Sequence, residues 1–360
     1  MELKTTIASL TSLTIMATSI CGYAQEASDY TKNPFGLVYR SAITENKVGE
    51  VNIHPVHYNL NGNEIAANVY TPANFDPTKS YAAVVVSHPN GGVKEQTAGL
   101  YAQRLAELGY VTIAADASYQ GASGGEPRNL DIPQNRINDV RGMVDYISQY
   151  KGVNPQRIGA LGICGGGGYT FATAQNDKRI KAAATLSLFN TGRVRRLGYQ
   201  DSQMTTVQER MKRASEARDK FAATGEVVYE GPTGTQTVEQ VREAMSRLVP
   251  GTLYHDGLEY YGITHAHPNS VSRYTTASLM DLMTWDATTH ADLISCPLLI
   301  MSGGKSDSDY MSREAYIKAT AAPQKEYFVI DGASHIQTYY VPEYVDKAVN
   351  KLSEFFGKHL

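Results

Sequence analysis

A cysteine lies at a turn of small residues, in the pattern small-x-nucleophile-x-small. The run Arg157–Cys164 has the apolar composition of a buried strand, and four glycines and a helix-compatible segment follow it. A chain that turns this sharply from strand to helix strains its central residue and presents that side chain at the end of the strand. Gly162 and Gly166 are the positions where a side chain would collide with the turn or the following helix. The pattern predicts that Cys164 is a nucleophile.

Two other interpretations of this turn are open. It could be a glycine-rich loop that binds a phosphate, or a tight turn around a buried free cysteine. The four glycines at positions 165–168 lack the Lys-Ser/Thr of a phosphate loop and the dinucleotide fingerprint, so no cofactor is expected. If Cys164 is the nucleophile, its thiolate attacks, and the start of the following helix is expected to lower the pKa of Cys164.

A nucleophile at such a turn needs a base and a residue that orients the base, in the chain order nucleophile, acid, histidine. His335 follows the last predicted strand and is the expected base. The acid is expected on the loop after the predicted strand Cys296–Ser302, where Asp307 and Asp309 both qualify. Asp307 is favoured, because Asp309 lies nearer the next predicted helix and suits a solvated first-turn carboxylate.

An acyl-transfer site also needs two backbone N–H donors for the oxyanion. Gly165, directly after the nucleophile, is expected to supply one. The loop His88–Gly92, at the end of the predicted strand Tyr81–His88, is expected to supply the other, from Asn90 first and Gly91 second. An ordinary strand-to-helix turn is the alternative for this loop.

Alternating strands and helices must position these residues. An antiparallel hairpin is predicted at Val51–Leu60 and Glu64–Thr71. The further predicted strands are Tyr81–His88, Tyr110–Ala117, Arg157–Cys164, Ile180–Phe189, Cys296–Ser302 and Glu326–Ile330. The helices predicted between and after them are Glu95–Leu108, Gln134–Tyr150, Gly166–Gln175, Ser312–Thr320 and Pro342 to about Phe356. This order predicts an α/β fold, with a mostly parallel twisted sheet and helices on both faces.

The alternation is interrupted between residues 190 and 290. Helices are predicted there at Val207–Ala223, Thr237–Leu248 and Thr275–Trp285, with an irregular stretch at Thr252–Tyr274. We interpret residues 190–290 as a mainly helical cap inserted into a core of residues 51–189 and 291–360. The chain has 24 tyrosines but only 8 phenylalanines and 1 tryptophan, and many tyrosines are expected to line a pocket or the cap.

The N-terminus has the pattern of an export signal. Lys4 precedes the mildly apolar stretch Ile7–Ile20, and small residues lead to a cleavage site after Ala24. Residues 1–24 are therefore predicted to be a signal peptide and 25–50 a leader, with export to the periplasm or the medium. A lipoprotein modified at Cys21 and an N-terminal helix, disordered or buried, are the alternatives.

Cleavage would leave Cys164 and Cys296. A disulfide between them is not expected, because Cys296 begins an apolar run that suits a strand. The net charge of −3, with no basic block, argues against nucleic-acid binding, and no stable membrane insertion is expected. His265 and His267 could form half a metal site, but no clear third ligand accompanies them, so a packing role and no metal are predicted.

Together, Cys164, the loop His88–Gly92, Asp307 and His335 resemble the dienelactone-hydrolase-like family of α/β-hydrolases, which has a Cys-Asp-His triad. The resemblance runs from Val51 to the C-terminus and implies an α/β-hydrolase fold with this triad. Two features depart from the small cytosolic family members: the export signal, and a spacing of 307 − 164 = 143 residues from nucleophile to acid. The fold and triad are therefore expected to hold, but the dienelactone substrate is not.

The expected function is hydrolysis of a small-molecule ester, lactone or thioester through an acyl-cysteine intermediate. An acyltransferase or a peptidase with the same triad is an alternative. A binding protein on a hydrolase scaffold that has lost its activity is another. The sequence alone does not identify the substrate, because the cap decides what reaches the cysteine.

Overall fold

The computed structural model describes residues 32–232 and 236–360, with an eight-stranded sheet as its core. The predicted signal peptide and the first residues of the leader lie outside the described residues. The strands run in the order β1-β2-β4-β3-β5-β6-β9-β10 across the sheet. Their bounds are β1 Asn52–Leu60, β2 Asn63–Thr71, β3 Tyr81–Ser87, β4 Val111–Ala115, β5 Val153–Ile163, β6 Ile180–Leu186, β9 Leu298–Gly303 and β10 Lys325–Ile330.

The sheet is mostly parallel, as the sequence predicted. β2 pairs antiparallel with both β1 and β4, and the other neighbouring strands pair in parallel. The central strand β3 is buried along its length except at Tyr81, because its run of alanine and valine is covered on both faces. Cys296 lies two residues before β9, and both it and Cys164 are free thiols.

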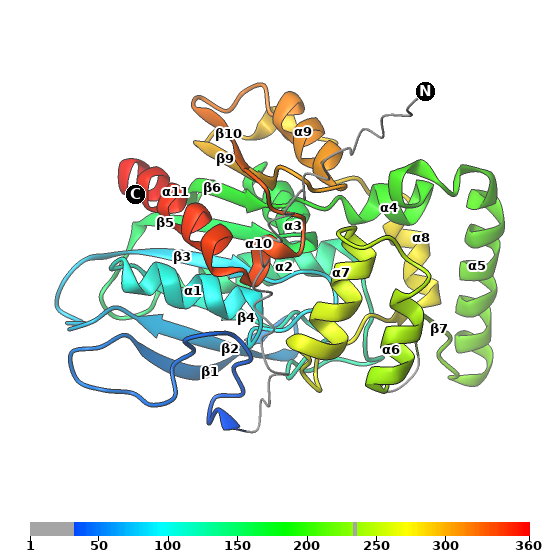
Figure 1. The fold of residues 1–360 in the computed structure, drawn as a ribbon, viewed down its shortest axis with the longest axis horizontal. Coiled ribbons are helices and arrows are strands. Elements are labelled where there is room, and N and C mark those ends of the chain that lie inside the picture. Colours follow the sequence, from blue (N-terminus) through cyan, green and yellow to red (C-terminus); the bar gives the residue numbers. More distant parts are fainter. Residues whose placement is uncertain (1–31, 233–235) are drawn as a thin grey trace, which may run out of the picture.

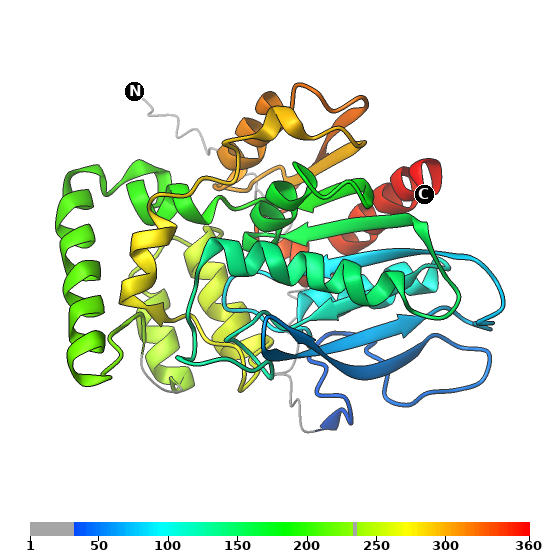
Figure 2. The same ribbon diagram turned by 180° about the vertical axis from the view of Figure 1, so that it is seen from behind.

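Helices cover both faces of the sheet (Figures 1 and 2). α1 and α11 lie on one face, and α2 and α3 lie on the other. The helices of the core are α1 Thr97–Glu107, α2 Pro133–Ser148, α3 Gly165–Ala174, α9 Asp309–Lys318, α10 Gln337–Tyr340 and α11 Pro342–His359. Within the described residues, none of the helices combines the length and apolar character that crossing a membrane requires.

An insertion of mostly helical segments separates β6 from β9, although these two strands pair directly in the sheet. Its elements gather at one side of the sheet, on the right in Figure 1. They are α4 Thr191–Leu197, α5 Val207–Thr224, β7 Tyr229–Glu230, α6 Val238–Met245, α7 Leu253–Glu259, a π-helix Tyr260–Thr264, β8 Tyr274–Thr275 and α8 Leu279–Leu282.

Parts of the insertion differ from the sequence prediction. The stretch expected to be irregular contains α7 and the π-helix, and the helix expected at Thr275–Trp285 is reduced to short turns around α8. Thr275 is unavailable to a helix because it pairs with Tyr229 in the two-stranded sheet. α7 begins where the Leu253 N–H donates to the Asp307 carboxylate, a contact across the fold that local sequence patterns do not reveal.

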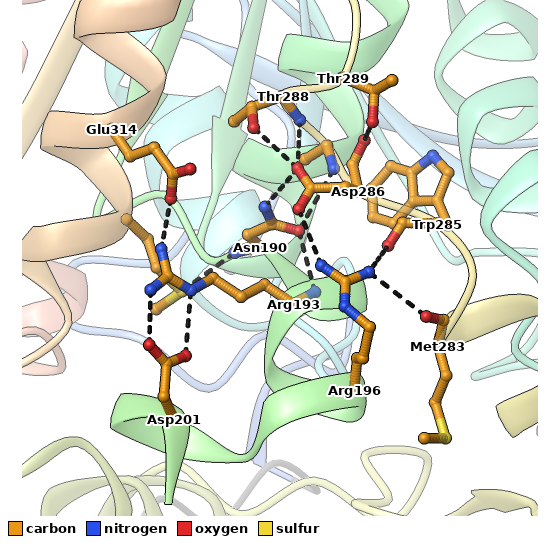
Figure 3. A network of polar contacts seen from close by, with 12 residues as sticks. Asn190, Arg193, Arg196, Asp201, Met283, Trp285, Asp286, Thr288, Thr289 and Glu314 are labelled. Atoms are coloured by element: carbon orange, nitrogen blue, oxygen red, sulfur yellow. Dashed lines mark hydrogen bonds and ion pairs between the residues drawn. The ribbon is translucent and has the colours of Figure 1, made fainter. Parts of the chain in front are cut away.

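A polar network ties the two ends of the insertion together (Figure 3). Asn190 Nδ2 donates to Asp286 Oδ1 at 2.8 Å, and Asn190 Oδ1 accepts from the backbone N–H groups of Arg193 and Ala287. Asp286 also accepts from the Thr288 N–H at 2.9 Å and from its hydroxyl at 2.7 Å. Since Asn190 follows β6 and Asp286 lies near the return to the sheet, these bonds fix where the insertion leaves and rejoins the core.

Replacing Asn190 with alanine should therefore destabilise the protein. The buried acceptor and donors that Asn190 satisfies would lose their partner, and we expect the free energy of unfolding to fall by about 2 kcal/mol. Urea unfolding measures this change. Asn350→Ala, on the exposed side of α11, is the control and should stay within about 0.5 kcal/mol of the parent protein. Equal stabilities for the two variants would contradict the anchoring role of Asn190.

Candidate active site

Cys164 occupies a strained turn between β5 and α3. Its backbone has φ 54° and ψ −119°, which a side-chain-bearing residue rarely adopts. A Cβ on Gly162 would lie 2.3 Å from the Gly166 carbonyl oxygen, and a Cβ on Gly166 would lie 2.4 Å from the Ser87 carbonyl oxygen. Both glycines are thus required, as predicted, and Gly166 is confined by the end of β3.

Two backbone N–H groups lie beside the Cys164 sulfur and act to lower its pKa, against the larger effect of burial. They belong to Gly165, the first residue of α3, and to Asn90, on the loop after β3. The Asn90 side chain donates to Thr191 Oγ1 at 2.9 Å, which fixes this loop against the start of α4. The structure therefore brings Asn90 and Gly165 together beside Cys164, and a Cβ on Gly165 would lie 2.1 Å from Asn90 Oδ1.

Gly91, the second candidate from the same loop, binds the insertion instead. Its carbonyl accepts from the Val271 N–H at 3.1 Å and from the Ser270 hydroxyl at 2.7 Å. Its φ of +71° and the Val271 carbonyl, 2.6 Å from a built Cβ, leave no room for a side chain. Gly91 thus joins the loop that carries Asn90 to the cap.

His335 lies fully buried between two hydroxyl groups. Its Nε2 is 2.9 Å from the Tyr339 hydroxyl, and its Nδ1 is 2.5 Å from Ser308 Oγ. The Tyr339 hydroxyl also interacts with the Cys164 thiol. Tyr339 therefore stands between the cysteine and the imidazole.

Neither predicted acid contacts His335. Both carboxylate oxygens of Asp307 accept from the Leu253 N–H, at 3.1 and 3.2 Å. Asp309 lies in the first turn of α9, as expected, and its carboxylate binds Arg313 and the Tyr327 hydroxyl. The expected pairing of Asp307 with the imidazole is thus corrected: Asp307 caps α7, and the next residue along the chain, Ser308, takes the place beside Nδ1.

Sequence reasoning missed Ser308 and Tyr339. Tyr339 had a usable signal, because it follows His335 by four residues and so shares its side of a helical turn. Ser308 had none, since it lies between the two aspartates and only the three-dimensional course of the loop decides which of the three residues faces the imidazole.

Burial dominates the electrostatics of this site. It raises the pKa of Cys164 to about 11, although the Tyr339 hydroxyl and the N–H groups of Gly165 and Asn90 act in the opposite direction. It lowers the pKa of His335 to about 3. The expected lowering of the cysteine pKa at the helix start is therefore outweighed by loss of solvent. At neutral pH the resting site holds a thiol and a neutral imidazole.

Tyrosines from the insertion surround the same sulfur. Tyr261, in the π-helix, is partly buried, and burial of its hydroxyl raises its pKa first, with the charge of Cys164 next. The pKa of Tyr254, in α7, is raised mainly by burial of its hydroxyl, and the charge of Cys164 adds to the rise. The tyrosine-rich composition thus supplies a wall of the site, as the sequence suggested.

His265 has a packing role. Its ring stacks on Tyr260 with the ring centres 4.3 Å apart, and its Nδ1 lies 2.9 Å from the Thr264 hydroxyl. Its carbonyl accepts from Gln96 Nε2 at 2.8 Å, which joins the insertion to the start of α1. No group of three or more possible metal ligands occurs within residues 32–232 and 236–360.

The sheet order, the covering helices and the turn at Cys164 are those of an α/β-hydrolase. A model of the dienelactone hydrolase family matches residues 65–208. The chain belongs to the dienelactone hydrolase family within the α/β-hydrolase superfamily.

Two bacterial relatives match most of the chain. The uncharacterized protein YcjY of Escherichia coli is 38% identical over 82% of this chain and 94% of its own length. The uncharacterized protein PA2218 of Pseudomonas aeruginosa is 35% identical over 84% of this chain and 79% of its own length. The crystal structure of PA2218 superposes with a TM-score of 0.75 and 33% identity, covering 86% of this chain and 94% of the solved one.

A more distant structure shares the fold alone. The crystal structure of the α/β hydrolase GrgF from Penicillium has a TM-score of 0.67 at 19% identity, covering 86% of this chain and 99% of the solved one.

Alkylation of Cys164 should report its raised pKa. Only the thiolate reacts, so the rate with iodoacetamide should keep rising with pH toward about 11, and at pH 8.5 only about 0.3% of Cys164 should be ionised. Mass spectrometry of the labelled peptide between pH 7 and pH 10.5 measures this rate. The urea-unfolded protein is the control and should level off above about pH 9. A plateau near pH 8.5 in the folded protein would contradict the raised pKa.

Proposed function

We propose that this protein is a hydrolase that cleaves an ester, lactone or thioester through an acyl-enzyme intermediate on Cys164. The observation that carries the proposal is a cysteine held at a strained strand-to-helix turn, with the Asn90 and Gly165 N–H groups beside its sulfur. Such donors stabilise the negative charge that develops on a carbonyl oxygen during attack. A buried structural cysteine needs neither the strain nor the two donors.

Acylation begins with a proton transfer from the thiol. The S–H proton passes to the Tyr339 oxygen while the Tyr339 hydroxyl proton passes to His335 Nε2, along contacts present in the resting site. The sulfur then forms a bond to the substrate carbonyl carbon, and the Asn90 and Gly165 N–H groups hold the oxyanion. The imidazolium returns its proton through Tyr339 to the departing alcohol or thiol as the ester or thioester bond breaks.

Deacylation repeats these steps with water. Water gives a proton to the imidazole and attacks the acyl carbon, and the departing Cys164 sulfur recovers a proton. The products are the carboxylic acid and the free thiol, so the enzyme returns to its starting state without a cofactor.

Ser308 orients the imidazole in place of a carboxylate. When the Tyr339 hydroxyl donates to Nε2, the neutral ring carries its own proton on Nδ1 and donates it to Ser308 Oγ. Ser308 in turn lies 2.9 Å from the hydroxyl of Ser306, which extends the chain of hydrogen bonds. A hydroxyl fixes the tautomer but brings no full negative charge, so the oxyanion donors must supply most of the stabilisation.

Replacement of Cys164 or His335 by alanine should abolish hydrolysis of p-nitrophenyl acetate and butyrate while the protein stays folded. The first change removes the nucleophile and the second removes the base, so kcat/KM should fall by at least about 10³-fold. Release of p-nitrophenol measures activity, and circular dichroism checks the fold.

Matched controls for these variants are Cys296→Ala and His290→Ala, which remove a second cysteine and an exposed histidine. Both should keep the activity of the parent protein. Full activity in Cys164→Ala would exclude the proposal, and a folded parent protein that neither hydrolyses these esters nor labels at Cys164 would favour a binding protein.

Tyr339→Phe separately tests the proposed proton transfer from Cys164 through Tyr339 to His335. Removing the hydroxyl breaks the path from sulfur to imidazole, and the usual size of general acid–base contributions predicts a loss of kcat of about 100-fold. Tyr340→Phe is the control, since this neighbour stacks near Tyr260 and His265 and should keep kcat within about twofold. A gain of activity in Tyr339→Phe would mean that the hydroxyl only blocks the base.

A further inference from the structure

A polar cavity of about 260 Å³ lies within the insertion. Its walls come from α4, α5, α7 and the two-stranded sheet of β7 and β8. Three arginines line it, Arg195, Arg210 and Arg213, against the single carboxylate of Glu230. The cavity is therefore positively charged overall.

Two of these arginines make contacts that hold the insertion together. Arg210 donates to the backbone carbonyls of Arg196 at 2.6 Å and Gln203 at 3.0 Å, and so ties α5 to α4. Arg213 lies 3.5 Å from the Glu230 carboxylate. Neither is free to bind another group without giving up a contact that holds the insertion together.

Arg195 differs from these two. Its guanidinium lies over the Tyr274 ring at 4.1 Å, and its Nε is buried with no hydrogen-bond partner among the described residues. The other arginines of α4 are paired: Arg193 with Asp201 and Glu314, and Arg196 with Asp286 (Figure 3). A buried donor without an acceptor is costly, so a site that keeps one is suited to an acceptor that arrives with a ligand.

The cavity adjoins the candidate active site. Arg195, in its wall, follows Thr191 by one turn of α4, and the Thr191 hydroxyl accepts from the Asn90 side chain at 2.9 Å, on the loop beside Cys164. Tyr254 also lines the cavity. Tyr199 lines it as well, and its ring packs edge-on against Tyr254 with the centres 5.0 Å apart. A flexible substrate held at Cys164 can thus extend along α4 toward Arg195 and the cavity.

We propose that Arg195 binds a carboxylate at the far end of the acyl chain of the substrate, whose carbonyl is attacked by Cys164. This inference rests on the proposed function and names its substrate class: half-esters or half-thioesters of dicarboxylic acids. The planar guanidinium offers paired N–H donors that match a carboxylate, and the ring of Tyr274 supports its face.

The charges near Arg195 favour a monoanion over a phosphate dianion. Asp131 is buried, which raises its pKa, while the charge of Arg195 acts to lower it. The described residues show no ion pair within 4 Å between the two side chains. Glu230 faces the same cavity. Since both are carboxyl groups, a phosphate dianion in the cavity would meet more repulsion from them than a single carboxylate would.

The test compares p-nitrophenyl half-esters of adipic and suberic acid with their methyl diesters, in which the remote carboxylate is masked. The parent protein should prefer the free acids in kcat/KM. Arg195→Gln should lower kcat/KM for the free acids by about 10- to 100-fold and change it by less than about threefold for the methyl diesters. Arg195→Lys, which keeps the positive charge but not the paired N–H donors of the guanidinium, should retain part of the preference for the free acids.

Arg213→Gln is the matched control, since it removes an arginine from the same cavity that already has a partner. It should change both substrate types equally. Equal losses for free acids and methyl diesters in Arg195→Gln, or a parent protein without preference, would overturn the inference and leave Arg195 as a structural residue.

Binding separates this inference from the proposed function. Adipate and suberate are titrated calorimetrically into Cys164→Ala, which cannot turn over, and into Cys164→Ala combined with Arg195→Gln. Heat of binding that disappears with Arg195→Gln supports the carboxylate site even if no ester is hydrolysed. Hydrolysis of neutral esters without any binding of the dicarboxylates would uphold the proposed function and reject the carboxylate site.

Discussion

The strained backbone of Cys164 is the constraint on which the site depends. A residue with φ 54° and ψ −119° persists only where its neighbours leave it no other conformation. Gly162 and Gly166 allow the close approach of α3 to β5 and to the end of β3. The same approach brings the Gly165 N–H and the loop of Asn90 beside the sulfur, so the strain and the position of the two proposed oxyanion donors have a common origin.

The insertion contributes residues to the candidate site that the sheet does not supply. It supplies Tyr254 and Tyr261 near the sulfur, and its α7 takes the Asp307 carboxylate through the Leu253 N–H. Asp307, on the loop predicted to carry the acid, therefore binds the cap, and Ser308 lies beside the His335 imidazole instead. Attachment of the cap and orientation of the base are thus coupled through two adjacent residues.

Enclosure by the cap has an electrostatic consequence. Removal of water from Cys164 and His335 raises the pKa of the first and lowers the pKa of the second, so both are neutral at rest. In the proposed reaction, proton transfer must then accompany attack, which makes the path through Tyr339 important. The same enclosure leaves Arg195 with a charge that no described side chain balances by a close ion pair.

The sequence by itself determined the sheet, the turn at Cys164, and the loops that carry Asn90 and His335, because buried strands, obligatory glycines and chain order leave local signals. It also placed an insertion between β6 and β9, although not α7 or the β7–β8 pair within it. Only the tertiary structure decided that Ser308 faces the imidazole, that Tyr339 lies beside the sulfur, and that Arg195 has no ion pair within 4 Å among the described residues. Those outcomes depend on contacts between segments far apart in the chain, and a neighbouring residue of similar polarity would satisfy the local pattern equally well.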